Sequence, residues 1–442
     1  MKITKKLWSI GLLSLLIVLL SIGGTGVIAQ DVTELTLSRF FGACEEEFGS
    51  VTDLEEASGE CGIITVMINA FNEQSDTVQI NVQGTEWGSY YDQLNAAFAG
   101  GNPPELAVMH RTRLIDYVDR GLVVAVGEDM ETAGISLNDF AGPALDAVTV
   151  NEEVYGLPFD LHTLLWHVNV DVLAEAGLVD GDGNPILPTS TEELLEHASI
   201  VKEATGVDYI AMDATQFPLG VRAVFAMIWQ QGGDLLTEDA SEANINNDIG
   251  LNALSTMSAL FDGEYANSTY DYATSEQAFL DGDAAILING TWVVDAYTAS
   301  AADESIGLTN YVVSDFPTIF GDAATWSDTH MWAVTNALDE EDLEAAMEFF
   351  NFINENNYHW SRTGHVSVRE SVLESEQYQS LPHRDEYTGT AQIARAFPRV
   401  LGYNELETIL QEEFQAVWIT GKSPEEALAD AERRINDALS FR

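Results

Sequence analysis

The chain has 442 residues and a mean hydropathy of −0.01, a size sufficient for about two to four globular domains at roughly 100–200 residues each. Its 72 Asp and Glu against 18 Lys and Arg give a net charge of −54, which repels nucleic acid and anionic lipid. These numbers favour a soluble globular protein and argue against nucleic acid as a partner.

The first 29 residues have the pattern of a signal peptide for export. Three lysines precede an apolar run at 7–20, and the small-residue sequence Val-Ile-Ala follows at 27–29. We expect cleavage before Gln30, and retention as a signal anchor is the alternative. No later apolar run approaches the roughly 20 residues that a membrane span needs. The sequence therefore predicts an exported protein, in the periplasm or at the outer face of the cytoplasmic membrane.

A strand pattern opens the expected mature chain at 34–41, and an acidic insertion follows at 42–62. Phe41 ends the strand, where open α/β sheets place ligands, although it could equally be a core residue. The insertion contains the two cysteines of the chain, Cys44 and Cys61. In an exported protein this pair predicts a disulfide that closes a surface loop. Metal ligation by two isolated cysteines is the weaker alternative.

Strand and helix patterns alternate from residue 63 to residue 120. They give a helix at 63–72, a strand at 77–82, a helix ending at 98, a strand at 105–109 and a helix ending at 120. This order predicts parallel βαβ units, whose ligands bind beyond the carboxyl ends of the strands. Glu86 and Trp87 follow one of these strands, and His110 and Arg111 follow the next. All four are therefore candidate ligand contacts.

The central stretch at 155–178 reads YGLPFDLHTLLWHVNVDVLAEAGL. A Gly-Pro turn precedes an extended segment, Asn169 can cap a short helix at 170–176, and Gly177 can end it. This pattern resembles the signature of the bacterial extracellular solute-binding proteins of the maltose-binding type. In that family a YG-x-P turn leads into a strand that crosses between two lobes. The resemblance implies a ligand between the lobes, with residues 160–163 at its floor.

Further motifs of the same family occur in the same order along the chain. They are GNPPEL at 101–106, PTSTEELLEHA at 188–198, FLDGDAAILINGTWVV at 279–294 and GHVSVRESV at 364–372. Two departures are Glu105, where the family carries Asp, and Ser367, where Pro is usual. Each motif alone is weak, but their order behind an export signal indicates the family.

The resemblance implies an α/β fold of the periplasmic-binding-protein type. Two α/β lobes would be joined by a hinge that the chain crosses about three times, with a ligand cleft between them. We expect the first lobe at 30–159 plus 317–366. The second lobe is expected at 160–316 plus 367–442.

The remaining candidate ligand contacts each have an alternative as core or as part of an internal ion pair. Asp160 and His162 fall on the crossing strand. The resemblance implies that Trp292 stacks on sugar, that Tyr403 takes the place of an aromatic on the late helices, and that two further residues face the cleft, Thr329 and His330. Two others are suggested by their residue type and position, Arg222 and Trp229. Aromatic faces and planar polar groups are what a sugar site needs.

The function implied by the resemblance is capture of a sugar or oligosaccharide and its delivery to the membrane subunits of an ABC importer. We expect a monomer without a cofactor or a covalent step. A secreted glycan hydrolase that uses paired carboxylates is the alternative of another class. A binder of a non-sugar solute, such as a polyamine or glycerol phosphate, is a third.

Catalytic and metal-binding motifs are not found in the sequence. It contains no G-x-S-x-G, H-E-x-x-H, P-loop or G-x-G-x-x-G pattern. The eight histidines are scattered, without the ligand spacing of a metal centre. We therefore expect neither an active site nor a bound metal.

Overall fold

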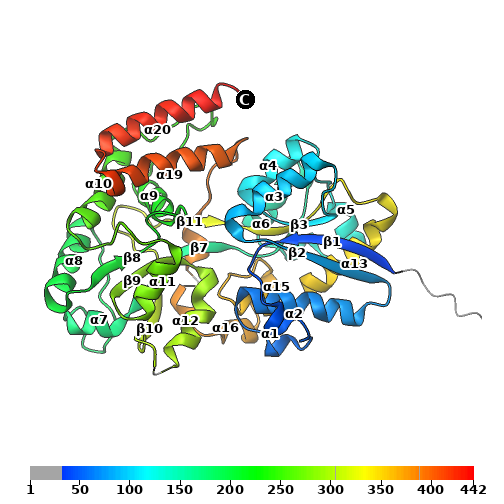
Figure 1. Ribbon diagram of the computed structural model, residues 1–442, viewed down its shortest axis with the longest axis horizontal. Coiled ribbons are helices and arrows are strands. Elements are labelled where there is room, and N and C mark those ends of the chain that lie inside the picture. The colour runs from blue at the N-terminus through cyan, green and yellow to red at the C-terminus, as the bar shows by residue number, and fades with distance from the viewer. Residues whose placement is uncertain (1–31, 304, 388) are drawn as a thin grey trace, which may run out of the picture. The chain divides into compact units, whose positions relative to one another are not determined.

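The computed structural model describes residues 32–442 except 304 and 388 (Figure 1). The predicted export signal lies outside the described residues. The fold is mixed α/β with two large sheets, each flanked by helices, as predicted. Among the described helices, none has the length and apolar content to cross a membrane.

The first sheet has the strand order β2-β1-β3-β12-β6. Its strands are β1 (Thr33–Arg39), β2 (Val78–Gly84), β3 (Leu106–His110), β6 (Leu157–Pro158) and β12 (His330–Val334). β1 runs parallel to β2 and β3, as expected for strands that alternate with helices, whereas β12 runs antiparallel to β3. The helices of this half are α1 (Glu45–Phe48), α2 (Gly59–Gln74), α3 (Trp87–Gly100), α4 (Arg111–Asp119), α5 (Gly127–Thr132), α6 (Gly142–Val148), α13 (Leu343–Glu355) and α14 (Asn357–Ser361).

The second sheet has the order β13-β11-β7-β9-β8, with β10 also paired to β7. Its strands are β7 (His162–Asn169), β8 (Asp208–Ala211), β9 (Ala284–Gly290), β10 (Tyr311–Asp315), β11 (Thr325–Asp328) and β13 (Ala394–Arg395). Every residue of β7 is buried, which fits its apolar sequence and its place inside the sheet. A separate hairpin joins β4 (Thr149–Val150) to β5 (Glu153–Val154).

Helices of the second half cover this sheet and continue to the C-terminus. They are α7 (Val170–Glu175), α8 (Thr191–Thr205), α9 (Leu219–Gln230), α10 (Asp248–Asp262), α11 (Tyr272–Leu280), α12 (Val294–Ala301), α15 (Glu370–Leu373), α16 (Glu376–Gln379), α17 (Arg384–Tyr387), α18 (Thr390–Ile393), α19 (Tyr403–Thr420) and α20 (Pro424–Leu439). Short 3-10 helices lie at Leu54–Glu56, Leu137–Asp139, Thr291–Val293 and Glu340–Asp342. α9 is wholly buried and mostly apolar, whereas α20 is amphipathic and buries one face.

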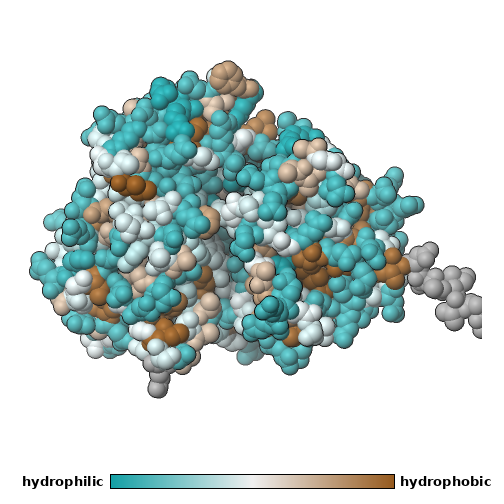
Figure 2. All heavy atoms as spheres, in the orientation of Figure 1, coloured by the Kyte–Doolittle hydropathy of each residue, from teal (hydrophilic) through white to brown (hydrophobic). Residues whose placement is uncertain are grey.

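Each sheet has its own apolar core. Leu37, Val108 and Phe349 belong to the core of the first, and Trp166 and Phe225 to that of the second. The outer surface is mainly hydrophilic on the face shown in Figure 2, with apolar residues scattered between polar ones. This distribution is expected for a highly acidic chain that buries its apolar side chains in its interior.

Three segments connect the two sheets. The first joins β6 to β7, the second joins β11 to β12, and the third lies between α14 and α17. The first and third meet directly, because Leu161 and Val366 exchange backbone hydrogen bonds of 2.9 and 3.0 Å. β11 pairs with β7 in the second sheet, although the predicted first lobe includes 317–366. The boundaries of the lobes stay a prediction.

The predicted disulfide between Cys44 and Cys61 is present, with 6.0 Å between the two Cα atoms. It closes the acidic insertion around α1 and reaches the first turn of α2. The crosslink thereby ties a segment with little core of its own to a helix of the first sheet.

Changing both cysteines to serine should lower the free energy of unfolding by about 3 kcal/mol, because the crosslink removes loop-closure entropy from the unfolded chain. The loop spans a sequence separation of 17 residues. Urea unfolding followed by tryptophan fluorescence measures the change. Wild-type protein kept under reducing conditions is the matched control and should unfold at the same urea concentration as the double variant. Equal stability of the oxidised protein and the double variant would contradict this prediction.

Candidate ligand-binding site

A cleft of about 390 Å³ lies between helices that flank the first sheet and helices that flank the second. One wall comes from α3 and α4, and the other from the segment before α9 and from α19. The lining residues include Trp87, Tyr91, Asp92, Asn95, Arg113, Asp116, Gln216, Phe217, Asn404, Glu407 and Gln411. The volume lies within the range typical of small-molecule sites. The cleft therefore offers a ligand both flat rings and planar polar groups.

Aromatic rings run from the cleft toward the second sheet. Trp87 and Phe217 meet edge to face with 5.0 Å between ring centroids, and Phe217 meets Tyr272 in the same way at 5.7 Å. The indole N–H of Trp292 donates to the hydroxyl of Tyr272 over 2.9 Å. Trp87, Phe217 and Trp292 are all half-buried. These rings retain accessible area that a ligand could cover.

A buried carboxylate, that of Glu407, joins the two walls of the cleft. Its oxygen Oε1 accepts from Nε and Nη2 of Arg222 over 3.1 and 2.9 Å, and Oε2 accepts from Nη2 of Arg113 over 3.5 Å. The hydroxyl of Tyr403 also donates to it. Burial opposes ionisation, but the charges of Arg222 and Arg113 prevail, so the pKa of Glu407 is lowered. Glu407 of α19 is thus ionised and pairs with Arg113 of α4.

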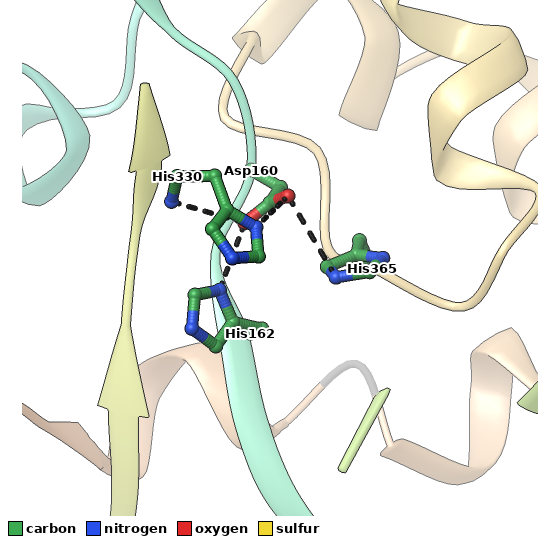
Figure 3. Close-up of side chains that lie close together, drawn as sticks. All are labelled: Asp160, His162, His330 and His365. Atoms are coloured by element: carbon green, nitrogen blue, oxygen red, sulfur yellow. Dashed lines mark hydrogen bonds and ion pairs between the residues drawn. The ribbon is translucent and has the colours of Figure 1, made fainter. Parts of the chain in front are cut away.

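A cluster of four side chains gathers where the connecting segments converge (Figure 3). Asp160 accepts from Nδ1 of His162 over 3.0 Å and from Nδ1 of His330 over 2.8 Å. Nε2 of His365 lies 3.7 Å from the same carboxylate. The exposed fractions of these residues are between 0% and 4%. Histidines distant in sequence thus surround one buried acid.

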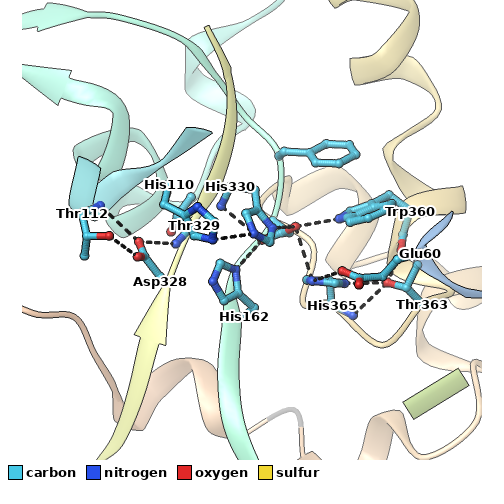
Figure 4. Close-up of polar contacts among 12 residues, drawn as sticks. Glu60, His110, Thr112, His162, Asp328, Thr329, His330, Trp360, Thr363 and His365 are labelled. Carbon is cyan, nitrogen blue, oxygen red and sulfur yellow. Dashed lines mark hydrogen bonds and ion pairs between the residues drawn. The ribbon is translucent and has the colours of Figure 1, made fainter. Parts of the chain in front are cut away.

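His110 continues this cluster toward the cleft (Figure 4). The hydroxyl of Tyr91 accepts from the backbone N–H of His110, so it donates its own proton to Nδ1 of that ring, over 2.8 Å in each case. Nε2–H of His110 then donates to Nε2 of His330 over 3.1 Å. Burial is the main reason that the pKa of His110 is lowered well below its usual range. His110 and His330 therefore connect a cleft-lining tyrosine to Asp160.

The predicted contacts fall into three groups in the structure. Trp87 lines the cleft. Arg222 and Tyr403 lie directly behind its lining, where both bond to the cleft residue Glu407. A second group lies in or beside the buried cluster: Phe41, His110, Asp160, His162 and His330, with Trp292 next to His162 at 6.0 Å between ring centroids.

The others lie apart from the cleft. Trp229 is 2% exposed and packs against Phe225 in the core of the second sheet. Glu86 is exposed at the start of α3, and Nη1 of Arg111 donates to the carbonyl of Phe397 over 2.8 Å. Thr329 lines a different cavity, of about 490 Å³. The roles of all these residues in binding stay predictions.

Sequence reasoning missed the lining residues Tyr91, Arg113, Phe217 and Glu407. Helical spacing could have identified two of them, because residues four apart lie on one face of a helix. Tyr91 lies one turn after Trp87, and Glu407 lies one turn after Tyr403. It also missed the gathering of three histidines around Asp160, because their spacing along the chain gives no signal.

Two α/β lobes and a cleft lined from both define a protein that binds a solute between its lobes. Residues 66–386 match the family described as bacterial extracellular solute-binding proteins, and the chain belongs to this family. Its members are exported binding proteins, consistent with the predicted export signal.

Named relatives are similar to this chain at low identity. The galactooligosaccharide-binding protein of Bacillus subtilis (strain 168) is 21% identical over 397 residues, which cover 86% of each chain. The lactose-binding protein of Rhizobium radiobacter is 25% identical over 226 residues, half of each chain. The maltose-bound MalE3 protein of T. maritima superposes with a TM-score of 0.77 at 18% identity, covering 93% of this chain and 100% of that one. This last likeness shows the fold.

Proposed function

We propose that the protein captures a sugar or oligosaccharide outside the cytoplasmic membrane and presents it to the membrane subunits of an ABC importer. The observation that carries this proposal is the cleft, where Trp87 and Phe217 lie beside the charged groups of Arg113 and Glu407. Sugars have apolar ring faces and hydroxyl edges, which such rings and planar groups complement. The galactooligosaccharide, lactose and maltose of the named relatives support the same class of ligand.

Capture would work through an equilibrium between open and closed arrangements of the lobes. A ligand that touches both walls favours the closed form by its differential affinity for the two arrangements. The pair formed by Arg113 and Glu407 joins α4 to α19 across the cleft. It would contribute to closure once the ligand has drawn the walls together. The importer would then recognise the closed surface, and no covalent step on the sugar is required.

Replacing Trp87 by alanine should weaken binding of the best sugar by more than tenfold, about 1.4 kcal/mol, because an aromatic face would be lost from the cleft. Trp292→Ala should have an effect of the same order if its ring reaches the ligand. A thermal-shift screen over mono- and oligosaccharides identifies the sugar, and isothermal titration calorimetry then measures the affinities. Phe441→Ala is the control, because its ring is 88% exposed and does not line the cleft. Unchanged affinity in Trp87→Ala would remove this residue from the site.

The same screen separates the alternatives. A binder gives a thermal shift with an intact oligosaccharide and releases no product over hours, whereas a hydrolase shortens it. Spermidine and glycerol 3-phosphate are included as non-sugar solutes. A shift with either of them alone, and with none of the sugars, would overturn the proposed class of ligand.

A further inference from the structure

The buried cluster around Asp160 joins all three segments that connect the two sheets. Asp160 lies on the first segment and His162 begins β7 directly after it, His330 begins β12 directly after the second, and His365 lies on the third. Each of the four offers one ligand atom, and these atoms lie within 4.8 Å of one another. Side chains from three separate segments therefore meet at a single point.

Hydrogen bonds satisfy most of this cluster, but one imidazole nitrogen has none. The hydroxyl of Thr363 donates to the carbonyl of Trp360 over 2.7 Å, so it accepts from Nδ1–H of His365, also over 2.7 Å. Nε2 of His365 is then left with a lone pair. Within the described residues this buried nitrogen has no hydrogen-bond partner.

The free lone pair of His365 faces two carboxyl groups. Its Nε2 lies 3.7 Å from Oδ2 of Asp160 and 3.5 Å from Oε1 of Glu60 (Figure 4). Both distances exceed that of a hydrogen bond between oxygen and nitrogen. The ionised oxygen of Asp160 repels this lone pair, and a bound cation between the two would turn the repulsion into attraction. The same nitrogen is wholly enclosed, so bulk water does not relieve the cost.

The donors are those of a closed transition-metal site. Three imidazoles and one carboxylate suit Zn²⁺, which binds such ligands in tetrahedral geometry. Metal–ligand bonds of about 2.1 Å place tetrahedral ligand atoms about 3.4 Å apart. The distances of 2.8, 3.0 and 3.7 Å from the carboxylate to the three rings bracket this value.

Surrounding groups would hold the ligands in place. Nε1–H of Trp360 donates to Oδ2 of Asp160 over 2.7 Å, and Thr363 fixes the proton of His365 on Nδ1. Such partners orient metal ligands in known sites. Ligation by Nδ1 of His330 moves the ring proton to Nε2, which then donates to Nε2 of His110. Metal entry thus requires shifts between neutral tautomers and no net loss of imidazole protons.

We propose that Asp160, His162, His330 and His365 form a binding site for a divalent transition-metal ion of the Zn²⁺ type. By binding residues from all three, the ion crosslinks the segments that connect the lobes. This inference goes beyond capture of a sugar and does not depend on it, because none of the four residues lines the cleft. Its consequence is a hinge whose stability depends on metal.

Metal stoichiometry of the purified full-length protein tests the proposal. The protein is stripped with EDTA, loaded with ZnCl₂ and passed over a desalting column with a weak competing chelator that clears ions from surface carboxylates. We expect one Zn²⁺ retained per chain by elemental analysis and a rise of several degrees in the melting temperature over the stripped form. Co²⁺ in place of Zn²⁺ should give the visible absorption bands of a tetrahedral site.

Two variants locate the site. His365→Gln removes Nε2, which makes no hydrogen bond, and its side-chain amide can donate to Thr363 in place of Nδ1–H. The stripped variant should therefore melt close to the stripped wild type while losing more than tenfold in Zn²⁺ affinity. Asp160→Asn should abolish stoichiometric binding. His383→Gln, which changes a histidine paired with Glu386, is the matched control and should retain one Zn²⁺. Circular dichroism checks that each variant folds.

The proposal is overturned if wild-type protein that has been stripped and then reloaded retains no Zn²⁺ and shows no Co²⁺ bands. This result does not depend on whether any variant folds. It is also overturned if His365→Gln and Asp160→Asn bind Zn²⁺ as tightly as His383→Gln. Sugar affinity, measured separately, distinguishes these outcomes from failure of the proposed function.

Discussion

Glu407→Gln should lower the free energy of unfolding by about 3–5 kcal/mol at pH 7, the usual cost of removing one partner from a buried ion pair. The side chains of Arg113 and Arg222 are only 10% and 9% exposed, so both charges would stay buried without their counter-ion. The variant also leaves the hydroxyl of Tyr403 facing an amide. Urea unfolding measures the loss. Weaker sugar binding should accompany it, because the ion pair between α4 and α19 is lost while the bond from Arg113 to Asn404 remains.

The matched control for this variant is Glu405→Gln on the same helix. Its carboxylate is 64% exposed and pairs with Arg442 at the surface, so we expect a change below about 1 kcal/mol. Similar losses of unfolding free energy in the two variants would contradict the claim that the buried ion pairs of Glu407 stabilise the fold.

Acid should reduce the difference between wild type and Glu407→Gln. Burial alone would raise the pKa of Glu407, but the two arginines lower it below its ordinary value of 4.5. The unfolded chain therefore takes up a proton at higher pH than the folded one does. Stability from this carboxylate is present above pH 4.5 and is lost as the pH falls through the lowered folded pKa. A difference that stays constant from pH 7 to pH 3 would refute this explanation.

Gly364→Ala should lower the free energy of unfolding by more than about 3 kcal/mol, because two unfavourable effects add at this position. Its φ of +122° is a conformation that L-residues rarely adopt. A Cβ atom there would lie 1.9 Å from the carbonyl oxygen of Thr291 and 2.8 Å from Cβ of Val294. The backbone of this connecting segment would have to move. Urea unfolding again measures the loss, and calorimetry measures the effect on sugar affinity.

Gly421→Ala separates the clash from the backbone conformation. Gly421 has a φ of +74°, and no atom lies within 4 Å of the position its Cβ would occupy. It should therefore cost only the conformational strain of an alanine at positive φ, about 1 kcal/mol. If the two variants are equally destabilised, close approach of Gly364 to Thr291 has no part in the effect.

Local sequence patterns determined the elements of this fold. Alternation of apolar residues marked β1 and β2, helical spacing marked α2, and the Ser-Pro-Glu-Glu sequence marked the start of α20, where Ser423 accepts from the backbone of Glu426. The order of the motifs indicated the family, and two cysteines in an exported chain predicted the disulfide. These features depend on neighbours in the chain, so the sequence expresses them directly.

The tertiary structure alone decided which side chains meet. Trp87 and Trp229 are both tryptophans at helix ends, yet one lines the cleft and the other lies in the core, because α9 is enclosed on every side. Strand register places His330 opposite His110, and Asp328 opposite His162. His365 joins them through the bridge from Leu161 to Val366. Apolar periodicity reports that a residue is buried but not against what, so contacts across some two hundred residues follow only from the packed sheets.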